Sequence, residues 1–324
     1  MPERVGKPSE NRPVRTYGPR RRRAARRRVG LAVGIACAAL AVVWAGGRIG
    51  GADGADAQAL DPSAFSAGAC VALAPTSGNR HLTVFLDAGH GGLDPGAIGT
   101  TTSGATIYEA DETLPVELDA ARLLRAQGFR VVVSRTSNSS VVRLTSADVS
   151  GGELSLVGAH DDVAARDVCA NLAHANVLVG IYLDSGAAPA NAGSLTTYDT
   201  ARPFARANQR LATLVQDDVL TTMNAHGWGI PDAGVLPDAL EGSAVATTST
   251  GAIATAAASY DHVLLLGPAM AGYFTTPSLM AGALIEPLFI TDPSEGSVAA
   301  STSGQEAIAH GLATAIDQYF APPA

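Results

Sequence analysis

The sequence predicts an α/β protein: a single domain with a mainly parallel, twisted sheet of about six strands flanked by helices, plus an N-terminal hydrophobic helix. Two patterns carry this prediction. Short apolar runs alternate with segments of helical periodicity between residues 83 and 320, and strands that alternate with helices form parallel sheets. The run at residues 177–183 is almost continuously apolar, which is typical of a strand covered on both faces.

Strands are expected where short β-branched and apolar runs are bounded by turn residues. These runs lie at residues 83–86, 129–134, 177–183, 262–266 and 283–289. Helices are expected where apolar residues recur every three or four positions. These segments are residues 114–127, 162–175, 203–226 and 305–320. In the first of them, Pro115 suits the first turn and Gly128 ends the helix. Two polar stretches, 137–158 and 232–259, are predicted to be surface loops.

The first 79 residues differ in composition from the rest. Residues 1–28, a basic cytoplasmic tail or n-region, hold eleven Lys and Arg against two acids, and residues 29–47 carry no charge. A basic block before an apolar segment keeps the N-terminus inside, so residues 29–47 are a cleaved signal or a membrane anchor. Residues 48–79 are predicted to be a linker. Residues 80–322 are then the main domain, exported either as a secreted protein or as a membrane-anchored one facing outside.

The formal charge argues against a nucleic-acid partner. The whole chain has a net charge of −8, but residues 49–324 hold ten arginines against 28 acidic residues. A protein that binds nucleic acid needs a basic face for the phosphates. The acidic main domain does not fit that class.

The cysteines leave two possibilities open. Cys37 lies in the apolar segment, whereas Cys70 and Cys169 belong to the exported part. In an oxidising compartment these two could form a disulfide. The alternative is two separately buried thiols.

Candidate reactive side chains follow the predicted strands, because ligands of open α/β sheets bind beyond the carboxyl ends of the strands. His90 stands in a glycine loop after the first strand, Glu109 precedes the first long helix, and Glu286 comes late in the last strand. One imidazole and two carboxylates are typical of a zinc hydrolase. Taken alone, His90 also fits an ordinary loop histidine, Glu109 an acid favoured by a helix dipole, and Glu286 an ion-paired strand end.

A resemblance to a known family favours the first interpretation. The string LDAGHGGLDPGAIG at residues 86–99 resembles the LDPGHGGxDPGAxG signature of the zinc-dependent N-acetylmuramoyl-L-alanine amidases, the type 3 cell-wall amidase family. The family's later motifs follow in order along residues 82–320. The matching segments of this chain are Glu109 with Leu114, the strand that ends in Ser134-Arg135, the helix with Arg166 and Asn171, and the segment from Leu284 to Asp292. In the last of these, Asp292 replaces the usual asparagine.

The resemblance implies roles for individual residues and one departure. His90 and Glu109 match zinc ligands, and Glu286 matches the catalytic glutamate. The family's third zinc ligand is a histidine, and Tyr182 stands at its place in Val179-Gly180-Ile181-Tyr182-Leu183-Asp184. A phenol with an unperturbed pKa of about 10 must lose a proton before it binds a metal. Three outcomes follow: Tyr182 ligates zinc weakly, another residue substitutes (Asp184, His160, His226 or His262), or the site holds no zinc.

The resemblance therefore implies a peptidoglycan hydrolase in which residues 80–322 are the catalytic domain. Its reaction is cleavage of the amide between N-acetylmuramic acid and the L-alanine of the stem peptide. Its expected cofactor is one Zn²⁺ ion, its substrate is peptidoglycan, and its N-terminal segment contacts the cytoplasmic membrane. The alternative, suggested by Tyr182, is a pseudo-amidase that binds cell wall or regulates other hydrolases. An exported hydrolase with a different substrate is a third possibility.

Overall fold

The computed structural model describes residues 57–186, 192–240 and 252–322. The basic segment 1–28 and the expected hydrophobic helix at 29–47 lie outside these residues, so both stay predictions. Within the described part of the chain, no helix combines the length and the apolar character that crossing a membrane requires.

The centre of the fold is an eight-stranded mixed sheet with the strand order β1-β2-β6-β3-β9-β12-β10-β11. The strands are β1 (Ala57–Ala59), β2 (Ala69–Leu73), β3 (Thr83–Ala88), β6 (Arg130–Arg135), β9 (Val177–Ile181), β10 (Ser194–Tyr198), β11 (Asp232–Pro237) and β12 (Ala281–Glu286). The four central strands β6, β3, β9 and β12 are parallel. Toward one edge β1 and β2 run antiparallel, and toward the other β10 is antiparallel to β12 but parallel to β11.

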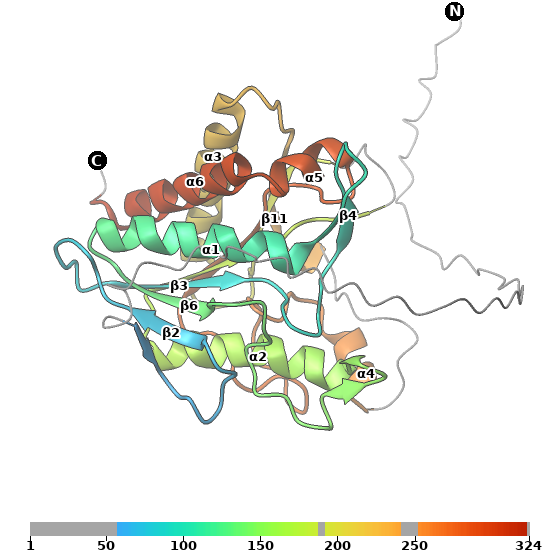
Figure 1. Ribbon diagram of the computed structural model, residues 1–324. Helices are drawn as coiled ribbons and strands as arrows, with labels where there is room; N and C mark the ends of the chain where they lie inside the picture. Colours follow the sequence, from blue (N-terminus) through green and yellow to red (C-terminus); the bar gives the residue numbers. More distant parts are fainter. Residues whose placement is uncertain (1–56, 187–191, 241–251, 323–324) are drawn as a thin grey trace, which may run out of the picture. The chain divides into compact units, whose positions relative to one another are not determined.

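Helices cover both faces of this sheet (Figure 1). Helices α1 (Glu109–Ala126), α3 (Ala205–Ala225) and α6 (Thr302–Phe320) pack together on one face. Helices α2 (Leu156–Leu172) and α4 (Ala252–Ser259) lie on the other, and α5 (Pro293–Ala299) follows β12. The strand β6 shows why both faces are apolar. Val131 and Val133 belong to the core under α1, whereas Val132 belongs to the core beside α2.

The α/β class is confirmed, and several details of the predicted fold are wrong. The sheet has eight strands rather than about six, and it is mixed, with four of its seven strand pairings parallel. The stretch 57–73, which the sequence analysis assigned to the linker, contributes β1 and β2, and the predicted loop at 232–259 contains β11 and α4. The expected strand at 262–266 is instead a turn, in which the Val263 carbonyl accepts hydrogen bonds from the N–H groups of Leu266 and Gly267. Its apolar residues Leu265 and Leu266 are still buried in the core.

Two small hairpins complete the described structure. They pair β4 (Ile98–Thr100) with β5 (Thr106–Tyr108) and β7 (Val149–Ser150) with β8 (Glu153–Leu154). The first hairpin lies between the loop after β3 and the start of α1. It therefore brings the chain from one candidate site residue, His90, to the next, Glu109.

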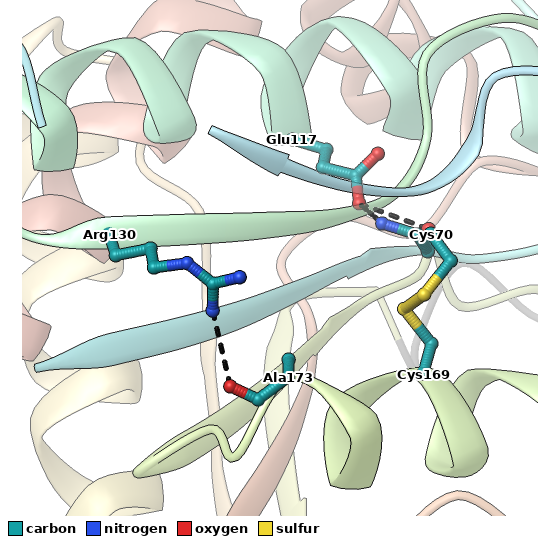
Figure 2. Close-up of a disulfide and its surroundings, with 6 residues drawn as sticks. Cys70, Glu117, Arg130, Cys169 and Ala173 are labelled. Carbon is teal, nitrogen blue, oxygen red and sulfur yellow. Dashed lines mark hydrogen bonds between the residues drawn. A yellow bond between two sulfur atoms is a disulfide. The ribbon is translucent and has the colours of Figure 1, made fainter. Parts of the chain in front are cut away.

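A disulfide joins Cys70 in β2 to Cys169 in α2 (Figure 2). Both residues are fully buried, and 99 positions separate them along the chain. Of the two possibilities that the sequence left open, the structure contains the disulfide. It attaches the antiparallel edge of the sheet to the helix that covers it, and it closes a loop that includes the whole β3–α1–β6 unit.

We expect the disulfide to contribute a large share of the stability. Closing a loop of about 100 residues restricts the unfolded chain and stabilises the fold by about 4 to 5 kcal/mol. The double variant Cys70→Ala/Cys169→Ala should lose free energy of unfolding on this scale, measured by urea denaturation. The control Cys37→Ala keeps both disulfide cysteines and should leave the value unchanged. A loss below about 1 kcal/mol in the double variant would contradict this assignment.

Candidate active site

The loop after β3 has a backbone conformation that only a few residue types adopt easily. His90 has a φ of 60°, and it is followed by Gly91 at 127° and Gly92 at 64°. A positive φ costs most residues roughly 1 to 2 kcal/mol, so surrounding contacts must hold His90 in place. The Gly89 N–H donates to the Ile181 carbonyl at 2.9 Å, which ties the start of the loop to the end of β9.

Two buried arginines hold the same loop from opposite faces of the sheet. Arg135, at the end of β6, donates to the carbonyls of Ala88 at 3.2 Å and Gly89 at 3.1 Å. Arg166, from α2, donates to the carbonyls of Ala88 and His90, each at 2.8 Å. Three consecutive carbonyls are thus satisfied by two guanidinium groups. This explains why both arginines occur in the motifs that the sequence analysis identified.

His90 and Glu109 come together in front of this loop. His90 Nε2 lies 3.2 Å from Glu109 Oε2, and His90 Nδ1 lies 2.8 Å from Asp94 Oδ2. Glu109 is the first residue of α1 and is 3 % exposed. Its Oε1 accepts from the Leu183 N–H at 2.8 Å, and its Oε2 accepts from the Ala97 N–H at 2.9 Å. Three separate segments therefore fix the position of one carboxylate.

The charges around His90 strongly favour the imidazolium form. Burial lowers its pKa, but the negative charge of Glu109 and the hydrogen bond to Asp94 outweigh that effect and raise the pKa to about 10. Between these two carboxylates the His90 ring carries a proton on both nitrogens at neutral pH when no metal ion is bound. A metal ion that bound at Nε2 would replace that proton.

Tyr182 lies beside His90 but directs its hydroxyl elsewhere. The two rings are 5.3 Å apart between centroids in an edge-on arrangement. The hydroxyl donates to Asp87 Oδ2 at 3.1 Å, and Asp87, which is fully buried, also forms an ion pair with Arg166. Burial and the charge of Asp87 hold the pKa of Tyr182 well above 10, with Arg166 acting in the opposite direction. The phenol is therefore a neutral donor in this arrangement.

Glu286 ends β12 at the same edge of the sheet. The Tyr182 N–H donates to the Ile285 carbonyl at 2.9 Å, and Ile181 pairs with Ile285 in the parallel register. Continuing that register by one residue puts Glu286 beside Tyr182 on the neighbouring strand. Thus His90, Glu109, Tyr182 and Glu286 all belong to the edge formed by the carboxyl ends of the central strands, as the sequence predicted.

The other residues considered as a third ligand lie in different surroundings. Asp184 is the nearest in the chain, and burial followed by the charge of Glu109 raises its pKa. His160 packs against Tyr273, His226 stacks on Trp228, and His262 contacts Asp199. Among the described residues, no third imidazole, carboxylate or thiol joins His90 and Glu109 in a group whose ligand atoms lie within 4.8 Å of one another.

Some functional contacts were not anticipated from the sequence. Asp94 was part of the quoted motif, but its contact with His90 was not predicted. Its position four residues after His90 could have suggested it. Asp292, which stands where the family pattern has an asparagine, accepts from the N–H groups of Ser294 and Glu295 as the N-cap of α5. Asn and Asp perform this role equally well.

The glycine loop, the paired His90 and Glu109, and the strand-end Glu286 define an α/β protein with a candidate hydrolase site at the carboxyl ends of its central strands. Residues 84–318 match the N-acetylmuramoyl-L-alanine amidase family (Amidase_3). The chain belongs to this family.

Two relatives are similar to this chain in sequence. The uncharacterized protein YqiI of Bacillus subtilis is 23% identical over 238 residues, covering 74% of this chain and 84% of its own. The probable N-acetylmuramoyl-L-alanine amidase AmiB of Haemophilus influenzae is 29% identical over 138 residues, which are 42% of this chain and 26% of AmiB.

Solved structures share the fold. The amidase AmiC2 of Nostoc punctiforme is similar with a TM-score of 0.51 and 21% identity, over 75% of this chain and 98% of that one. The CwlD amidase of Clostridioides difficile, solved in complex with the GerS lipoprotein, gives a TM-score of 0.53 and 19% identity, over 74% of this chain and 98% of CwlD.

Gly96 provides a direct test of the His90–Glu109 arrangement. A Cβ at this position would lie 2.7 Å from both Glu109 Oε2 and His90 Cδ2. We expect Gly96→Ala to separate the two side chains and to cost more than the roughly 1 to 2 kcal/mol of a strained backbone alone. Urea denaturation measures the cost, and the ring signals of His90 in NMR spectra report the local change.

Gly104→Ala is the matched control for this variant. Gly104 has a similarly positive φ of 82°, but nothing lies within 4 Å of an added Cβ. It should show the backbone cost only and leave the His90 signals unchanged. Equal losses in the two variants, with unchanged His90 signals in both, would contradict the described site.

Proposed function

We propose that this protein hydrolyses the amide between the lactyl group of N-acetylmuramic acid and L-alanine of the peptidoglycan stem peptide. The observation that carries the proposal is the placement of His90 Nε2 at 3.2 Å from Glu109 Oε2, with Nδ1 held by Asp94. This pair lies at the sheet edge where Glu286 ends β12. Membership of the amidase family supports the same reaction.

Two of the three expected ligand positions, His90 and Glu109, carry side chains that fit a zinc ion. Imidazole nitrogen and carboxylate oxygen are ordinary zinc ligands. A carboxylate on the second ring nitrogen is the usual support for a zinc-bound histidine, and Asp94 supplies it. Tyr182 stands at the third position and must give up both its proton and its hydrogen bond to Asp87 before it can ligate. The site therefore fits zinc with an affinity reduced by position 182.

The protein's own groups account for the proton transfers. Zinc, when bound, supplies a Lewis acid that polarises the scissile carbonyl and acidifies water. Glu286 accepts a proton from the attacking water as the water oxygen bonds to the carbonyl carbon. Glu286 then returns that proton to the alanine nitrogen as the carbon–nitrogen bond breaks. The products are a lactyl carboxylate and a stem peptide with a free amino terminus.

We further propose that the reaction takes place outside the cytoplasmic membrane, with peptidoglycan as the partner. The disulfide between Cys70 and Cys169 supports an oxidising compartment. The basic and apolar residues 1–47 would export the chain or keep it attached to the membrane beside its substrate.

The variant Glu286→Gln tests the proton-transfer role. It keeps the size of the side chain but cannot take up a proton, so turnover should fall by about 10² to 10⁴-fold. The measurement is the appearance of free L-alanine amino termini from purified peptidoglycan. Zinc content should stay unchanged. The control Glu306→Gln alters an exposed glutamate of α6 and should retain full activity. Full activity in Glu286→Gln would remove this residue from the mechanism.

One observation favours a second function, a pseudo-amidase that binds cell wall without cleaving it. The Tyr182 hydroxyl donates its proton to Asp87, so this side chain cannot become a phenolate ligand without losing that hydrogen bond. In that case the purified chain would bind peptidoglycan, hold no zinc at this site and release no amino termini. Stoichiometric zinc together with release identifies the enzyme instead.

Substituting Tyr182 distinguishes how this position acts. Tyr182→His introduces a ligand that binds zinc without first losing a proton at neutral pH, so zinc affinity should rise by at least about tenfold. Tyr182→Phe is the matched control, because it keeps the ring beside His90 and removes only the hydroxyl. If Tyr182 ligates zinc, the Phe variant binds zinc more weakly than the natural protein. Unchanged zinc content and turnover in the His variant would show that position 182 does not face the site.

A further inference from the structure

A second group of potential metal ligands lies far from His90 along the sheet. Asp199 directly follows β10, Asp238 directly follows β11, and His262 lies in the turn after α4. One ligand atom from each of the three lies within 4.8 Å of the others. Since β10 and β11 are parallel, their carboxyl ends meet at one edge of the sheet, and this brings the two aspartates together.

The carboxyl ends of β10 and β11 lie on the side of the sheet opposite to the carboxyl ends of the central strands, where His90 and Glu109 lie. Strand β10 is antiparallel to β12, so its carboxyl end lies near the amino end of β12. Asn208 makes the proximity explicit: it donates to the Asp199 carbonyl at 2.9 Å and accepts from the Gly282 N–H at 3.0 Å. Gly282 and Glu286 are four residues apart, roughly 13 Å along a strand. The second group is thus separate from the candidate active site.

The two aspartates are fully buried, and each uses only part of its carboxylate in hydrogen bonds. Asp199 Oδ1 accepts from the N–H groups of Ala201 and Arg202, and Asp238 Oδ2 accepts from the Val263 N–H. Asp199 Oδ2, Asp238 Oδ1 and His262 Nδ1 have no hydrogen-bond partner among the described residues. Buried polar atoms without a partner are rare and costly.

The short contacts within the group do not supply these missing hydrogen bonds. His262 Nδ1 lies 2.7 Å from Asp199 Oδ2 and 3.5 Å from Asp238 Oδ2, yet neither contact has hydrogen-bond geometry, because His262 Nδ1 remains without a hydrogen-bond partner. Each of the three residues offers a ligand atom within 4.8 Å of the other two, which is close enough for all three to reach one cation.

The surroundings are short of positive charge. Asp167 is a further fully buried carboxylate, and neither of its oxygens has a hydrogen-bond partner among the described residues. Arg202 is the neighbouring cation, and its guanidinium donates to the carbonyls of Gly267 and Ser278. An added cation would offset the remaining negative charge.

We propose that Asp199, Asp238 and His262 form a structural zinc site, independent of the proposed catalytic one. The imidazole favours Zn²⁺ over Ca²⁺ and Mg²⁺, which prefer oxygen ligands alone. Three protein ligands leave a fourth position for water or a further side chain. The ion would attach the ends of β10 and β11 to the turn after α4, and so would fix the edge of the sheet that the active site does not use.

The test uses the full chain with the other candidate site disabled. In a His90→Gln/Glu109→Gln background, metal-stripped protein is titrated with Zn²⁺ by calorimetry, and its zinc content is measured after dialysis. We expect one equivalent to bind and the melting temperature to rise by about 5 °C at a hundredfold excess over Kd. Adding Asp238→Asn/His262→Gln should abolish both effects, whereas Asp217→Asn/His226→Gln, the same changes at exposed positions, should preserve them.

Each outcome separates this proposal from the catalytic one. If the natural chain binds two equivalents, both sites hold zinc. If it binds a single equivalent that the Asp238/His262 changes remove, the result supports the structural zinc site and contradicts zinc binding at the proposed catalytic site. If the His90→Gln/Glu109→Gln protein binds no zinc, or if its zinc survives the Asp238/His262 changes, the three residues are an ion-paired cluster and the proposal is overturned.

Discussion

The arrangement of the candidate active site depends on two buried guanidinium groups that share three backbone carbonyls. Arg135 and Arg166 come from opposite faces of the sheet, and both donate to the Ala88 carbonyl. His90 needs this support because its backbone is in the left-handed region. Charged donors make stronger hydrogen bonds than neutral ones, and an arginine fork can hold several acceptors at fixed angles. The strained loop is thus positioned by these side chains in addition to the backbone hydrogen bond from Gly89 to Ile181.

The same arginine links the loop to position 182. Arg166 forms ion pairs with both Asp87 and Asp162, and Asp87 also accepts from the Tyr182 hydroxyl. Tyr182 therefore adds a hydrogen-bond donor to the buried ion-pair network of Arg166, Asp87 and Asp162. At the proposed zinc site, the same hydrogen bond would keep this hydroxyl from the metal, so stability and metal affinity would make opposite demands on position 182.

The sequence predicted those parts of the fold whose physical signals are local. Strands β3 and β9 follow from apolar runs, and most of helix α1 follows from its apolar periodicity and the closing glycine. The expected start of α1 was wrong, because the helix begins at Glu109 and Pro115 lies inside it rather than in its first turn. His90, Glu109 and Glu286 were expected at one edge because parallel strands end there together, and the structure agrees. Strand β10 was missed because Ser194, Thr196 and Thr197 are polar, although they are buried. Their burial depends on Gln216 of α3, which bonds Ser194 and Thr196 and cannot be inferred from the strand alone.

The second ligand group was missed for the same reason. Asp199 and Asp238 mark strand ends only once β10 and β11 are known to be strands, and His262 was placed in a strand that does not form.

The antiparallel direction of β10 relative to β12 has a further consequence for the fold. In a wholly parallel sheet all carboxyl ends, and hence all strand-end side chains, face one edge. The antiparallel pairing of β10 with β12 places the carboxyl ends of β10 and β11 opposite those of the central strands, so that charged residues can gather there away from His90. The mixed topology is therefore what allows one sheet to carry two separate groups of candidate ligand side chains.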